Sequence, residues 1–328
     1  MPAIGMTKKQ TEAIQLIRRI SSGYWASRVL LTAATHTLFD HLEKPVTAKG
    51  LAKKRSLDPR ALEIVLDALV SIGLVKKTKK TYHNSGAASS FLVSGNPYYQ
   101  GDILAHHASL WERWSDLDGI LKEGVPSSRG RDFESFIQGM HNLSVLKSEK
   151  IVSQLDLKGV GRVLDLGGGP GTYSVSFAKR GVDVTLFDMK DTYKIAKDVI
   201  GSSPVKGTIS FKGGDFVHDD IGKGYDLVLI SQIFHAYGEK ENMNLLRKVR
   251  KALNRNGRVL IQEFLVNDDR TSPVPGALFA VNMLVNTSEG RTYSPREMIA
   301  WLRKTGFGSV KRSFFEDNVL IEARKASR

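Results

Sequence analysis

The spacing of apolar residues changes character at residue 162, and this change separates two kinds of structure. Before it, apolar side chains recur every three or four residues, which is typical of amphipathic helices. After it, short runs of Val, Ile and Leu alternate with helical patterns. Such alternation predicts a mainly parallel sheet with helices on both faces. We therefore expect an α/β fold preceded by a mainly α-helical part.

The mainly helical part begins with the element order of a winged helix. The predicted elements are two helices within 7–43 parted by a Ser-Ser-Gly break at 21–23, a short helix opened by Thr47, a longer helix opened by Asp58-Pro59 and ended by Gly73, and extended stretches around 74–75 and 81–82. Such a module can bind DNA or can serve a structural or dimerising purpose.

Two further helices are predicted between the winged helix and the sheet. The first spans 102–123 and the second 132–155, with a linker at 124–131 between them. The strands predicted after them lie near 162–166, 183–188, 208–212, 225–231 and 258–266, with a closing pair near 309–314 and 318–323.

Composition excludes several kinds of chemistry. The chain has 328 residues, of which 41% are apolar, so it can bury a substantial core. It has no cysteine, which excludes disulfides, thiolate nucleophiles and Cys-ligated zinc, and no His-x-x-x-His or paired-carboxylate spacing suggests another metal site. Neither a membrane-spanning stretch nor the apolar core of a secretion signal is found, so we expect a cytoplasmic protein without a membrane partner.

The net charge of +14 raises the question of a polyanionic partner. Ten basic residues face three acidic ones within 44–80, including the Lys76-Lys77-Thr78-Lys79-Lys80 run. However, the helix that would enter a DNA groove, 60–72, is rich in Ala, Leu, Val and Ile and offers little besides Arg60 to base edges. The pattern therefore favours a structural or dimerising use over nucleic-acid binding, with the lysines on a solvated wing.

A glycine-rich turn follows the first predicted strand, in the run Val163-Leu-Asp-Leu-Gly-Gly-Gly-Pro-Gly171. Glycines leave room for a ligand against the backbone, and the helix that starts at Thr172 offers unpaired N–H groups. Asp165 ends the strand just before this turn. The junction therefore predicts a site for an adenosine-like ligand.

Polar side chains also end the next three strands, at the edge where an open parallel sheet binds its ligands. Asp188 lies about 20 residues beyond the turn, where a carboxylate can accept from both ribose hydroxyls. Asp215 could accept from an adenine amine, with Phe216 packed on the ring. The fourth strand ends at Ser231-Gln232, and His235 follows.

These residues resemble the S-adenosylmethionine-dependent methyltransferases, and within them the two-domain small-molecule O-methyltransferases related to plant caffeate and hydroxyindole enzymes. The resemblance covers nearly the whole chain. The motifs that carry it, in the family's order and spacing, are Val163-Leu-Asp-Leu-Gly-Gly-Gly-Pro-Gly171, Gly214-Asp-Phe216, Tyr225-Asp-Leu-Val-Leu-Ile-Ser231, Phe234-His-Ala-Tyr237, Gln262-Glu-Phe264 and Asn282-Met-Leu-Val-Asn286.

The resemblance implies a division into three regions. Residues 1–100 would form a winged-helix dimerisation domain, and 101–155 would be connecting helices that contribute to the substrate pocket. Residues 156–328 would be the catalytic domain, with a Rossmann-like, mostly parallel sheet and a reversed last strand. The implied partners are a small aromatic substrate and a second copy of the chain, bound through the first domain.

The resemblance also implies the cofactor, S-adenosylmethionine, which leaves as S-adenosylhomocysteine, without a metal. In that family the equivalent of Asp188 holds the ribose, that of Asp215 the adenine, and the glycine turn the methionine part. The cofactor-binding residues expected on this basis are Asp165, Gly167, Gly168, Gly169, Gly171, Asp188, Met189, Asp215, Phe216, Ser231, Gln232 and Ser144.

The implied reaction is in-line transfer of an activated methyl group to a hydroxyl oxygen whose proton must be removed. His235 matches the family's catalytic base, and Glu263 matches an acid that orients its ring. The residues expected to line the substrate pocket are Trp111, Phe136, Met140, Met283 and Asn286. The chain departs from the family's usual His-Asp-Trp at Ala236-Tyr237, and a second flanking Glu of plant enzymes is Thr292 here.

Three other interpretations remain open. A dehydrogenase would share the glycine turn and Asp188, but the Gly167-x-Gly169-x-Gly171 spacing is not that of a dinucleotide fingerprint. A DNA-binding regulator could sense a ligand through the second domain. A relative that methylates carbon, or binds the cofactor without donating methyl, would share every cofactor residue; only the positions of His235 and Glu263 argue against it.

Overall fold

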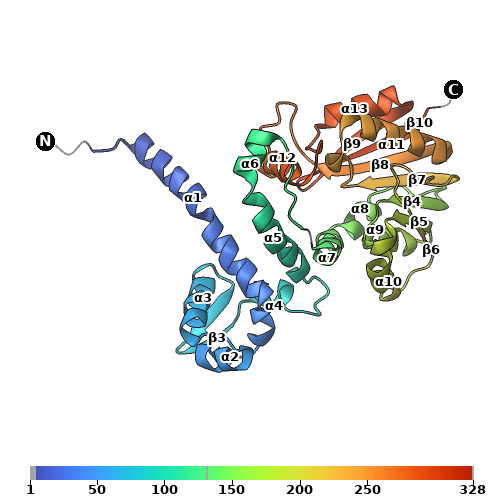
Figure 1. Ribbon diagram of the computed structural model, residues 1–328. Helices are drawn as coiled ribbons and strands as arrows, with labels where there is room; N and C mark the ends of the chain where they lie inside the picture. Colours follow the sequence, from blue (N-terminus) through green and yellow to red (C-terminus); the bar gives the residue numbers. More distant parts are fainter. Residues whose placement is uncertain (1–4, 131, 327–328) are drawn as a thin grey trace. The chain divides into compact units, whose positions relative to one another are not determined.

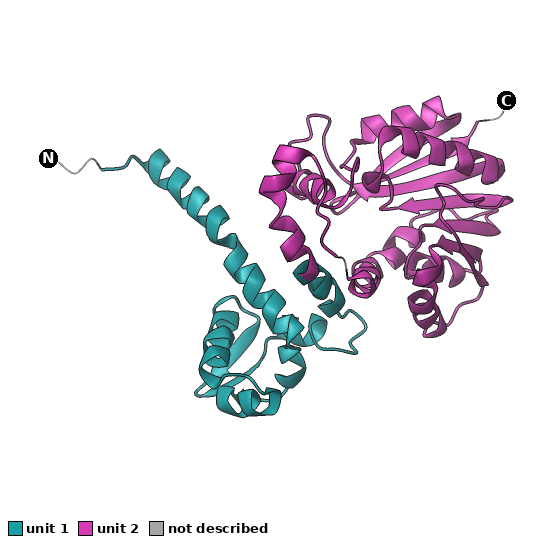
Figure 2. Ribbon diagram, in the orientation of Figure 1, with its two compact units in different colours: residues 1–108 teal, residues 109–328 magenta. Residues whose placement is uncertain are grey.

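The structure of the protein is a computed structural model that describes residues 5–130 and 132–326. The chain forms two compact units, unit 1 over 1–108 and unit 2 over 109–328 (Figure 2). Arg131, in the predicted linker, lies outside the described residues, as do the outermost residues of the first and last predicted regions.

Unit 1 begins with one continuous helix, α1 (Lys8–Thr35), so the predicted break at 21–23 is wrong (Figure 1). A capping box at Thr7 and Gln10 starts the helix. Within it, both serine hydroxyls of the Ser-Ser-Gly triplet donate to the carbonyl of Arg18, at 3.1 and 2.7 Å. A glycine inside a helix costs only about 1 kcal/mol relative to alanine. The triplet therefore does not end so long a helix.

The rest of unit 1 confirms the winged-helix order. Its elements are η1 (Leu38–His41), β1 (Val46–Thr47), α2 (Ala48–Arg55), α3 (Pro59–Ser71), β2 (Val75–Thr78), β3 (Thr81–Asn84) and α4 (Gly86–Phe91), and its small antiparallel sheet has the order β1-β3-β2. Thr47 and Asp58 cap α2 and α3 as predicted, because their side chains accept the N–H groups of Gly50 and Ala61.

Each of the two helices predicted between 102 and 155 is divided in two. The first forms α5 (Gly101–Trp114) and α6 (Leu117–Glu123), separated at Ser115 and Asp116. The carboxylate of Asp116 accepts from the hydroxyl of Ser127, at 2.6 Å, and from the guanidinium of Arg129. These bonds to the following coil favour a break between α5 and α6, because serine and aspartate side chains compete with the helix for backbone hydrogen bonds.

The second predicted helix forms α7 (Phe133–Val145) and α8 (Ser148–Ser153). Asp132 caps α7, since its carboxylate accepts the N–H of Ser135 at 3.1 Å. The described part of the coil between α6 and α7 is the predicted linker.

Unit 2 is built on a seven-stranded sheet with the order β6-β5-β4-β7-β8-β10-β9. Its strands are β4 (Arg162–Leu166), β5 (Asp183–Asp188), β6 (Ile209–Gly213), β7 (Tyr225–Ser231), β8 (Leu253–Phe264), β9 (Phe307–Phe315) and β10 (Asn318–Lys325). β4 to β8 pair in parallel, whereas β10 runs antiparallel to both β8 and β9. The mostly parallel sheet with a reversed last strand is confirmed, although β8 begins five residues earlier than predicted.

Helices cover both faces of this sheet (Figure 1). They include α9 (Thr172–Ala178), α10 (Tyr193–Gly201), α11 (Glu239–Ala252), α12 (Val274–Asn286) and α13 (Pro295–Lys304), with short turns η2 (Lys190–Thr192) and η3 (Phe234–Ala236). One core packs α8 and α9 against the sheet, and the other packs α11 and α13 against its opposite face. Among the described residues no helix has the length and apolarity needed to cross a bilayer.

Candidate active site

The glycine turn lies at the edge where the parallel strands end. Gly167, Gly169 and Gly171 all have positive φ, at 67°, 52° and 78°. The N–H of Gly167 donates to the carbonyl of Phe187 at 2.8 Å, and the N–H of Gly169 donates to Oδ2 of Asp188 at 2.7 Å. The turn is therefore tied to the end of β5, which brings Asp188 beside it as expected.

A side chain at either of the first two positions of the turn would force neighbouring side chains to move. A Cβ on Gly167 would lie 2.5 Å from Ile233 Cδ1 and 3.3 Å from Phe216 Cε1, and one on Gly168 would lie 2.3 Å from Leu186 Cδ1. Because these positions are glycines, the backbone of the turn is not covered by side chains of its own where it lies beside the ring of Phe216. A backbone that carries no side chain suits a nucleoside that must lie close against it, so the residues present fit an adenosine-containing cofactor.

The three predicted carboxylates differ in their surroundings. Asp165 is 1% exposed, and its Oδ2 accepts from the hydroxyl of Ser174 at 2.7 Å. Burial raises the pKa of Asp165 to about 6, against the opposing effect of that hydrogen bond. The side chain therefore lies beneath the turn rather than at its open side.

Asp188 is half-buried and holds two backbone groups. Its Oδ1 accepts the N–H of Met189 at 2.7 Å, while its Oδ2 takes the N–H of Gly169. Burial raises the pKa of Asp188, and these amide bonds act in the opposite direction. Each carboxylate oxygen has a second lone pair, so the group can still accept from hydroxyls of a ligand. The side chain of Met189 is 53% exposed.

Asp215 and Phe216 follow β6. Oδ1 of Asp215 accepts the N–H of Val217 at 2.8 Å. The ring of Phe216 meets the ring of Tyr237 edge to face, with centroids 5.7 Å apart. Ile233 and Tyr237 thus lie beside residues of the predicted adenosine site. Neither was a predicted site residue, although Tyr237 was noted as a departure from the family's motif. The contact that places Tyr237 here is the packing of its ring on Phe216, and only the fold reveals it.

A buried polar network lies at the ends of β7, β8 and β10. Oε1 of Gln262 accepts from the hydroxyl of Tyr173 at 2.6 Å and from Ser231 Oγ at 3.2 Å. Gln232 has φ of 60°, and its Nε2 donates to Asn318 Oδ1 at 2.8 Å. Ser231 and Gln232 were predicted site residues, whereas the other three were not.

His235 and Glu263 meet as predicted. The ring Nδ1 of His235 lies 2.8 Å from Glu263 Oε2, and the backbone N–H of Phe234 donates to Glu263 Oε1 at 2.6 Å. Both side chains are largely buried, with 12% and 4% exposed. When Nδ1–H donates to the carboxylate, Nε2 of the ring is left as a proton acceptor. The pair has the geometry of an oriented general base.

Aromatic side chains flank this pair. The ring of Phe279, on α12, meets the His235 ring edge to face, with centroids 4.9 Å apart, and lies 4.0 Å from the ring of Phe264. Neither phenylalanine was a predicted pocket residue. They come from the end of β8 and from a helix whose contacts the sequence pattern does not reveal.

The predicted substrate residues lie on α5, α7 and α12. Trp111 is on α5, Phe136 and Met140 are on α7, and Met283 and Asn286 are on α12. Ser144, which was predicted to bind the cofactor, is also on α7. Met283 is only 7% exposed, whereas Phe136 is 36% exposed. A buried arginine that the sequence pattern missed, Arg113, donates through Nε to Asn286 Oδ1 at 2.7 Å and through Nη2 to the carbonyl of Ser127 at 2.7 Å.

The position of Thr292 is one of the chain's departures from the plant-type pattern. Thr292 is 3% exposed, and its neighbour Arg291 pairs with Glu297 at 2.8 Å. Glu297 also caps α13 by accepting the N–H of Ser294, so it belongs to the start of that helix. Among the described residues, Glu263 is the carboxylate bound to the His235 ring.

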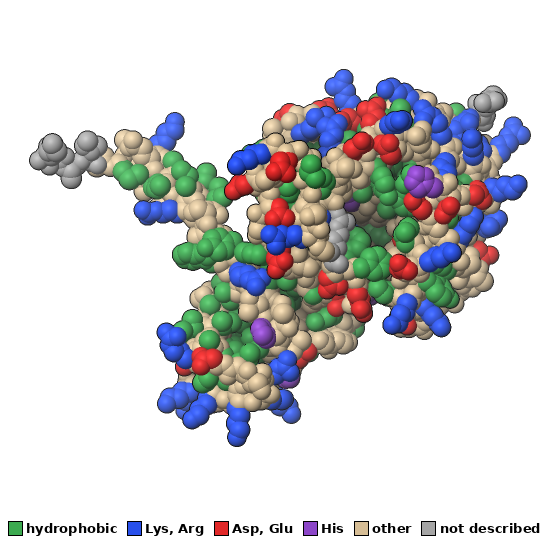
Figure 3. All heavy atoms as spheres, viewed as in Figure 1, with side chains coloured by type: hydrophobic (Ala, Val, Ile, Leu, Met, Phe, Trp, Pro, Cys, Tyr) green, Lys and Arg blue, Asp and Glu red, His purple; other side chains and the backbone are tan. Residues whose placement is uncertain are grey.

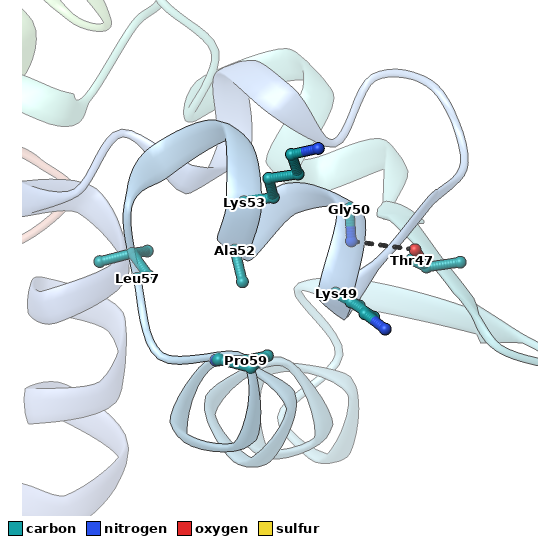
Figure 4. A pocket seen from close by; sticks show the side chains of 7 residues that line it. All are labelled: Thr47, Lys49, Gly50, Ala52, Lys53, Leu57 and Pro59. Carbon is teal, nitrogen blue, oxygen red and sulfur yellow. Dashed lines mark hydrogen bonds between the residues drawn. The ribbon is translucent and has the colours of Figure 1, made fainter.

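Unit 1 has an open hollow of about 560 Å³, lined by Thr47, Lys49, Gly50, Ala52, Lys53, Leu57 and Pro59 (Figure 4). It lies between the starts of α2 and α3, where Ala52 points toward Pro59.

The ten basic residues within 44–80 are all exposed, and blue side chains gather along the lower margin of unit 1 in Figure 3. None of the predicted site residues lies in this unit.

Comparison with known proteins agrees with this geometry. Residues 125–308 match the O-methyltransferase domain, and residues 19–94 match the O-methyltransferase dimerisation domain. The chain is 31% identical to 3-hydroxy-5-methyl-1-naphthoate 3-O-methyltransferase of Streptomyces sahachiroi, over 90% of each chain. It is 28% identical to acetylserotonin O-methyltransferase of Bos taurus, over 93% of this chain and 96% of that protein.

Among solved structures, human N-acetylserotonin methyltransferase in complex with S-adenosylmethionine has the same fold. It superposes with a TM-score of 0.88 at 23% identity, covering 98% of this chain and all of that one. The chain belongs to the O-methyltransferase family. Members of this family depend on S-adenosylmethionine, so the predicted cofactor is confirmed at the level of the family.

Proposed function

We propose that the protein transfers the methyl group of S-adenosylmethionine to a hydroxyl of a small aromatic molecule, with His235 as general base. The observation that carries the proposal is the His235–Glu263 pair, with Nδ1 and Oε2 2.8 Å apart. The pair lies at the carboxyl edge of the same sheet that holds the glycine turn. The cofactor and the general base His235 are thus expected at the same edge of the sheet.

The cofactor supplies a methyl group already activated by a positively charged sulfur. The ribose hydroxyls would be held by Asp188, whose carboxylate is oriented by the amides of Gly169 and Met189. The adenine would lie near Asp215 and Phe216, and the methionine part would lie along the glycine turn, where the Gly167 backbone carries no side chain. The other residues proposed to contact the cofactor are Asp165, Gly168, Gly171, Ser231, Gln232 and Ser144, of which Asp165 acts from beneath the turn.

The role of Glu263 would be to orient the imidazole of His235. One oxygen of Glu263 binds Nδ1–H and the other binds the Phe234 amide, so the carboxylate cannot rotate without losing a bond. His235 then keeps Nε2 free to take the hydroxyl proton of the acceptor as the methyl group is transferred. Burial of both side chains strengthens the interaction of the pair once the ring is charged.

A flat aromatic acceptor is favoured by the rings beside the base. Phe264 and Phe279 pack together next to His235 and offer faces on which a planar molecule can stack. Trp111, Phe136, Met140, Met283 and Asn286 are the further residues proposed to line the pocket. The relatives named for a hydroxynaphthoate and for acetylserotonin support an acceptor of this kind.

A homodimer formed through unit 1 is also part of the proposal. The match to the dimerisation domain supports it, and so do apolar side chains on α1 that are left open to solvent, among them Ile17 at 60%, Ile20 at 70% and Trp25 at 64% exposed. Several large apolar side chains exposed on one helix are typical of an association interface.

Calorimetric titration with S-adenosylmethionine and S-adenosylhomocysteine tests the cofactor, and assays on hydroxylated aromatics test the reaction. We expect micromolar binding that Asp188→Ala removes, and transfer that His235→Ala lowers about 100-fold or more while binding persists. Binding without transfer to any oxygen would favour a carbon-methylating or non-methylating relative. Failure to bind either sulfur compound would contradict the proposal.

A further inference from the structure

Three side-chain amides form a buried chain at the carboxyl edge of the sheet. Gln232 follows β7, Gln262 lies near the end of β8, and Asn318 begins the reversed strand β10. Gln262 is fully buried and Asn318 is 4% exposed. Amides in such surroundings must satisfy their donors and acceptors from one another, because water cannot reach them.

The neighbouring hydroxyls set the orientation of these amides. Oε1 of Gln262 accepts from Tyr173 and from Ser231, so its Nε2 faces Asn318 Oδ1, at 3.5 Å. Nε2 of Gln232 donates to the same Oδ1 at 2.8 Å. Asn318 thus presents one oxygen to two amide donors, and this shared acceptor determines which way the carboxamide of Gln232 points.

Of these three amides, Gln232 is the one whose oxygen, Oε1, is buried without a partner among the described residues. A buried acceptor without a hydrogen bond is unfavourable, because it has lost its bonds to water. The same residue has φ of 60°, a left-handed conformation that glycine adopts far more easily than glutamine. Strain and an open acceptor at one residue, three positions before His235, indicate a group prepared for a ligand.

The ligand group that suits Oε1 of Gln232 is one that donates hydrogen bonds and accepts none. The network begins at Tyr173, in the first turn of α9 directly after the glycine turn, where the proposed function expects the methionine part of the cofactor. That part carries a carboxylate, which only accepts, and an ammonium, which only donates. The ribose and adenine donors are already assigned to Asp188 and Asp215.

We propose that Asn318 is a positioning residue, which turns the carboxamide of Gln232 so that Oε1 accepts a hydrogen bond from the ammonium of the cofactor's amino acid end. The inference rests on the proposed function, because it assumes that cofactor. With this role for Asn318, the reversed strand β10 contributes to ligand binding, which no sequence motif or residue spacing had indicated.

The test compares two ligands in calorimetric titrations, S-adenosylhomocysteine and 5′-methylthioadenosine, which lacks the amino acid end. Asn318→Leu should weaken S-adenosylhomocysteine about 10-fold or more and methylthioadenosine less than twofold, since a hydrogen bond to a charged group is lost. Gln232→Leu should do the same. The double variant should be no weaker than Gln232→Leu alone, because Asn318 acts through Gln232.

Two further variants separate positioning from damage to the fold. Asn318→Asp keeps an oxygen for the Gln232 donor and should bind S-adenosylhomocysteine within a few-fold of the wild type. Asn84→Leu, in unit 1, removes an asparagine that is 7% exposed and bonded to the Phe39 carbonyl at 2.8 Å. It should lower the melting temperature as Asn318→Leu does and leave both affinities unchanged.

The outcomes are distinct. Equal weakening of both ligands by Asn318→Leu, or additive losses in the double variant, would overturn the positioning role. If the wild type bound both ligands with equal affinity, the ammonium contact would be refuted, but the assignment of S-adenosylmethionine as the cofactor would remain. If it bound neither ligand, the proposed function itself would fail.

Discussion

The side chain of Glu263 illustrates how single residues define this site. Its two oxygens bind a backbone N–H and an imidazole N–H, so the same carboxylate anchors the η3 turn and orients the ring that follows it. In a site that excludes water, such a carboxylate also stabilises the positive charge that the ring gains with the proton.

Replacing this carboxylate should therefore affect turnover rather than binding. We expect Glu263→Gln to lower kcat about 100-fold and to change the affinity for S-adenosylhomocysteine less than threefold. Glu322→Gln is the matched control, because it removes a carboxylate of β10 that pairs at 3.2 Å with Arg258 of β8, the strand that carries Glu263. It should leave kcat unchanged. A Glu263→Gln enzyme with wild-type kcat would contradict the role of this pair.

The glycine turn makes a second prediction at the residue scale. Gly167 and Gly181 both have positive φ, at 67° and 81°, but only Gly167 has a neighbour that a Cβ would strike. Gly181→Ala should lower the free energy of unfolding by about 1–2 kcal/mol through backbone strain alone. Gly167→Ala should lower it further, through the clash with Ile233, and should abolish cofactor binding. Chemical denaturation and titration measure the two effects, and equal losses in the two variants would refute the clash.

Asp165 gives the site a pH dependence of stability. Burial raises its folded-state pKa from 3.8 to about 6, so the folded protein holds this proton more tightly than the unfolded chain does. The stabilisation is complete below pH 4 and is lost as the pH rises through about 6. Relative to Asp165→Asn, the wild type should gain about 2 kcal/mol between pH 7 and pH 4.

Denaturation curves of the two proteins at several pH values provide the measurement. Asp183→Asn is a control of opposite sign, because bonds from Thr208 lower the pKa of Asp183. Relative to that variant, the wild type should lose stability as the pH falls. A constant difference between wild type and Asp165→Asn across this range would show that the carboxyl group titrates normally.

At the scale of elements, strands were more predictable than helices. The central strands β4, β5 and β7 are short apolar runs, and six of the seven strands of the large sheet begin within two residues of the prediction. Helix ends depended on side chains far along the chain. Asp116 separates α5 from α6 and is bonded to Ser127 and Arg129, ten or more residues away, and no local pattern predicts such bonds.

The same contrast separates the predicted site residues from those that were missed. Asp188, His235 and Glu263 could be located because each lies at or shortly after the carboxyl end of a strand that a pattern identifies. Asn318 and Phe279 could not, because their roles arise from packing between elements that the sequence does not order in space. Sequence pattern thus locates the residues at strand ends, whereas their partners require the fold.

The long helix α1 makes a prediction of its own. It continues through Ser-Ser-Gly and leaves Ile17 and Ile20 mostly exposed, which suits an interface with a second copy. The double change Ile17→Glu with Ile20→Glu should convert a dimer to monomers in sedimentation velocity, because it places charges within the buried interface. Lys9→Glu with Arg18→Glu, on the same helix, should remain dimeric. A wild-type monomer, or a dimer unaffected by the isoleucine changes, would place the interface elsewhere.

At the scale of the whole molecule, positive charge is concentrated in unit 1. Residues 1–108 contain fifteen basic and seven acidic residues, whereas 109–328 contain 33 and 27. However, the exposed face of α3 carries Glu63 and Asp67 beside Arg60, and Asp67 pairs with Lys77 at 2.7 Å. Acidic groups on the helix that would enter a groove oppose sequence-specific DNA binding.

This distribution predicts weak, non-specific attraction to polyanions that is separate from catalysis. The protein should bind a short DNA duplex in low salt, without preference for sequence, and should release it by about 0.2 M salt because the contacts would be to phosphates. Lys53→Glu with Lys54→Glu should weaken this binding and leave the affinity for S-adenosylhomocysteine unchanged, since both lysines are exposed on α2. Fluorescence anisotropy with two unrelated duplexes is the measurement. A preference of more than tenfold for one duplex at physiological salt would instead mark unit 1 as a regulator's DNA-binding domain, and the lysines as its contacts.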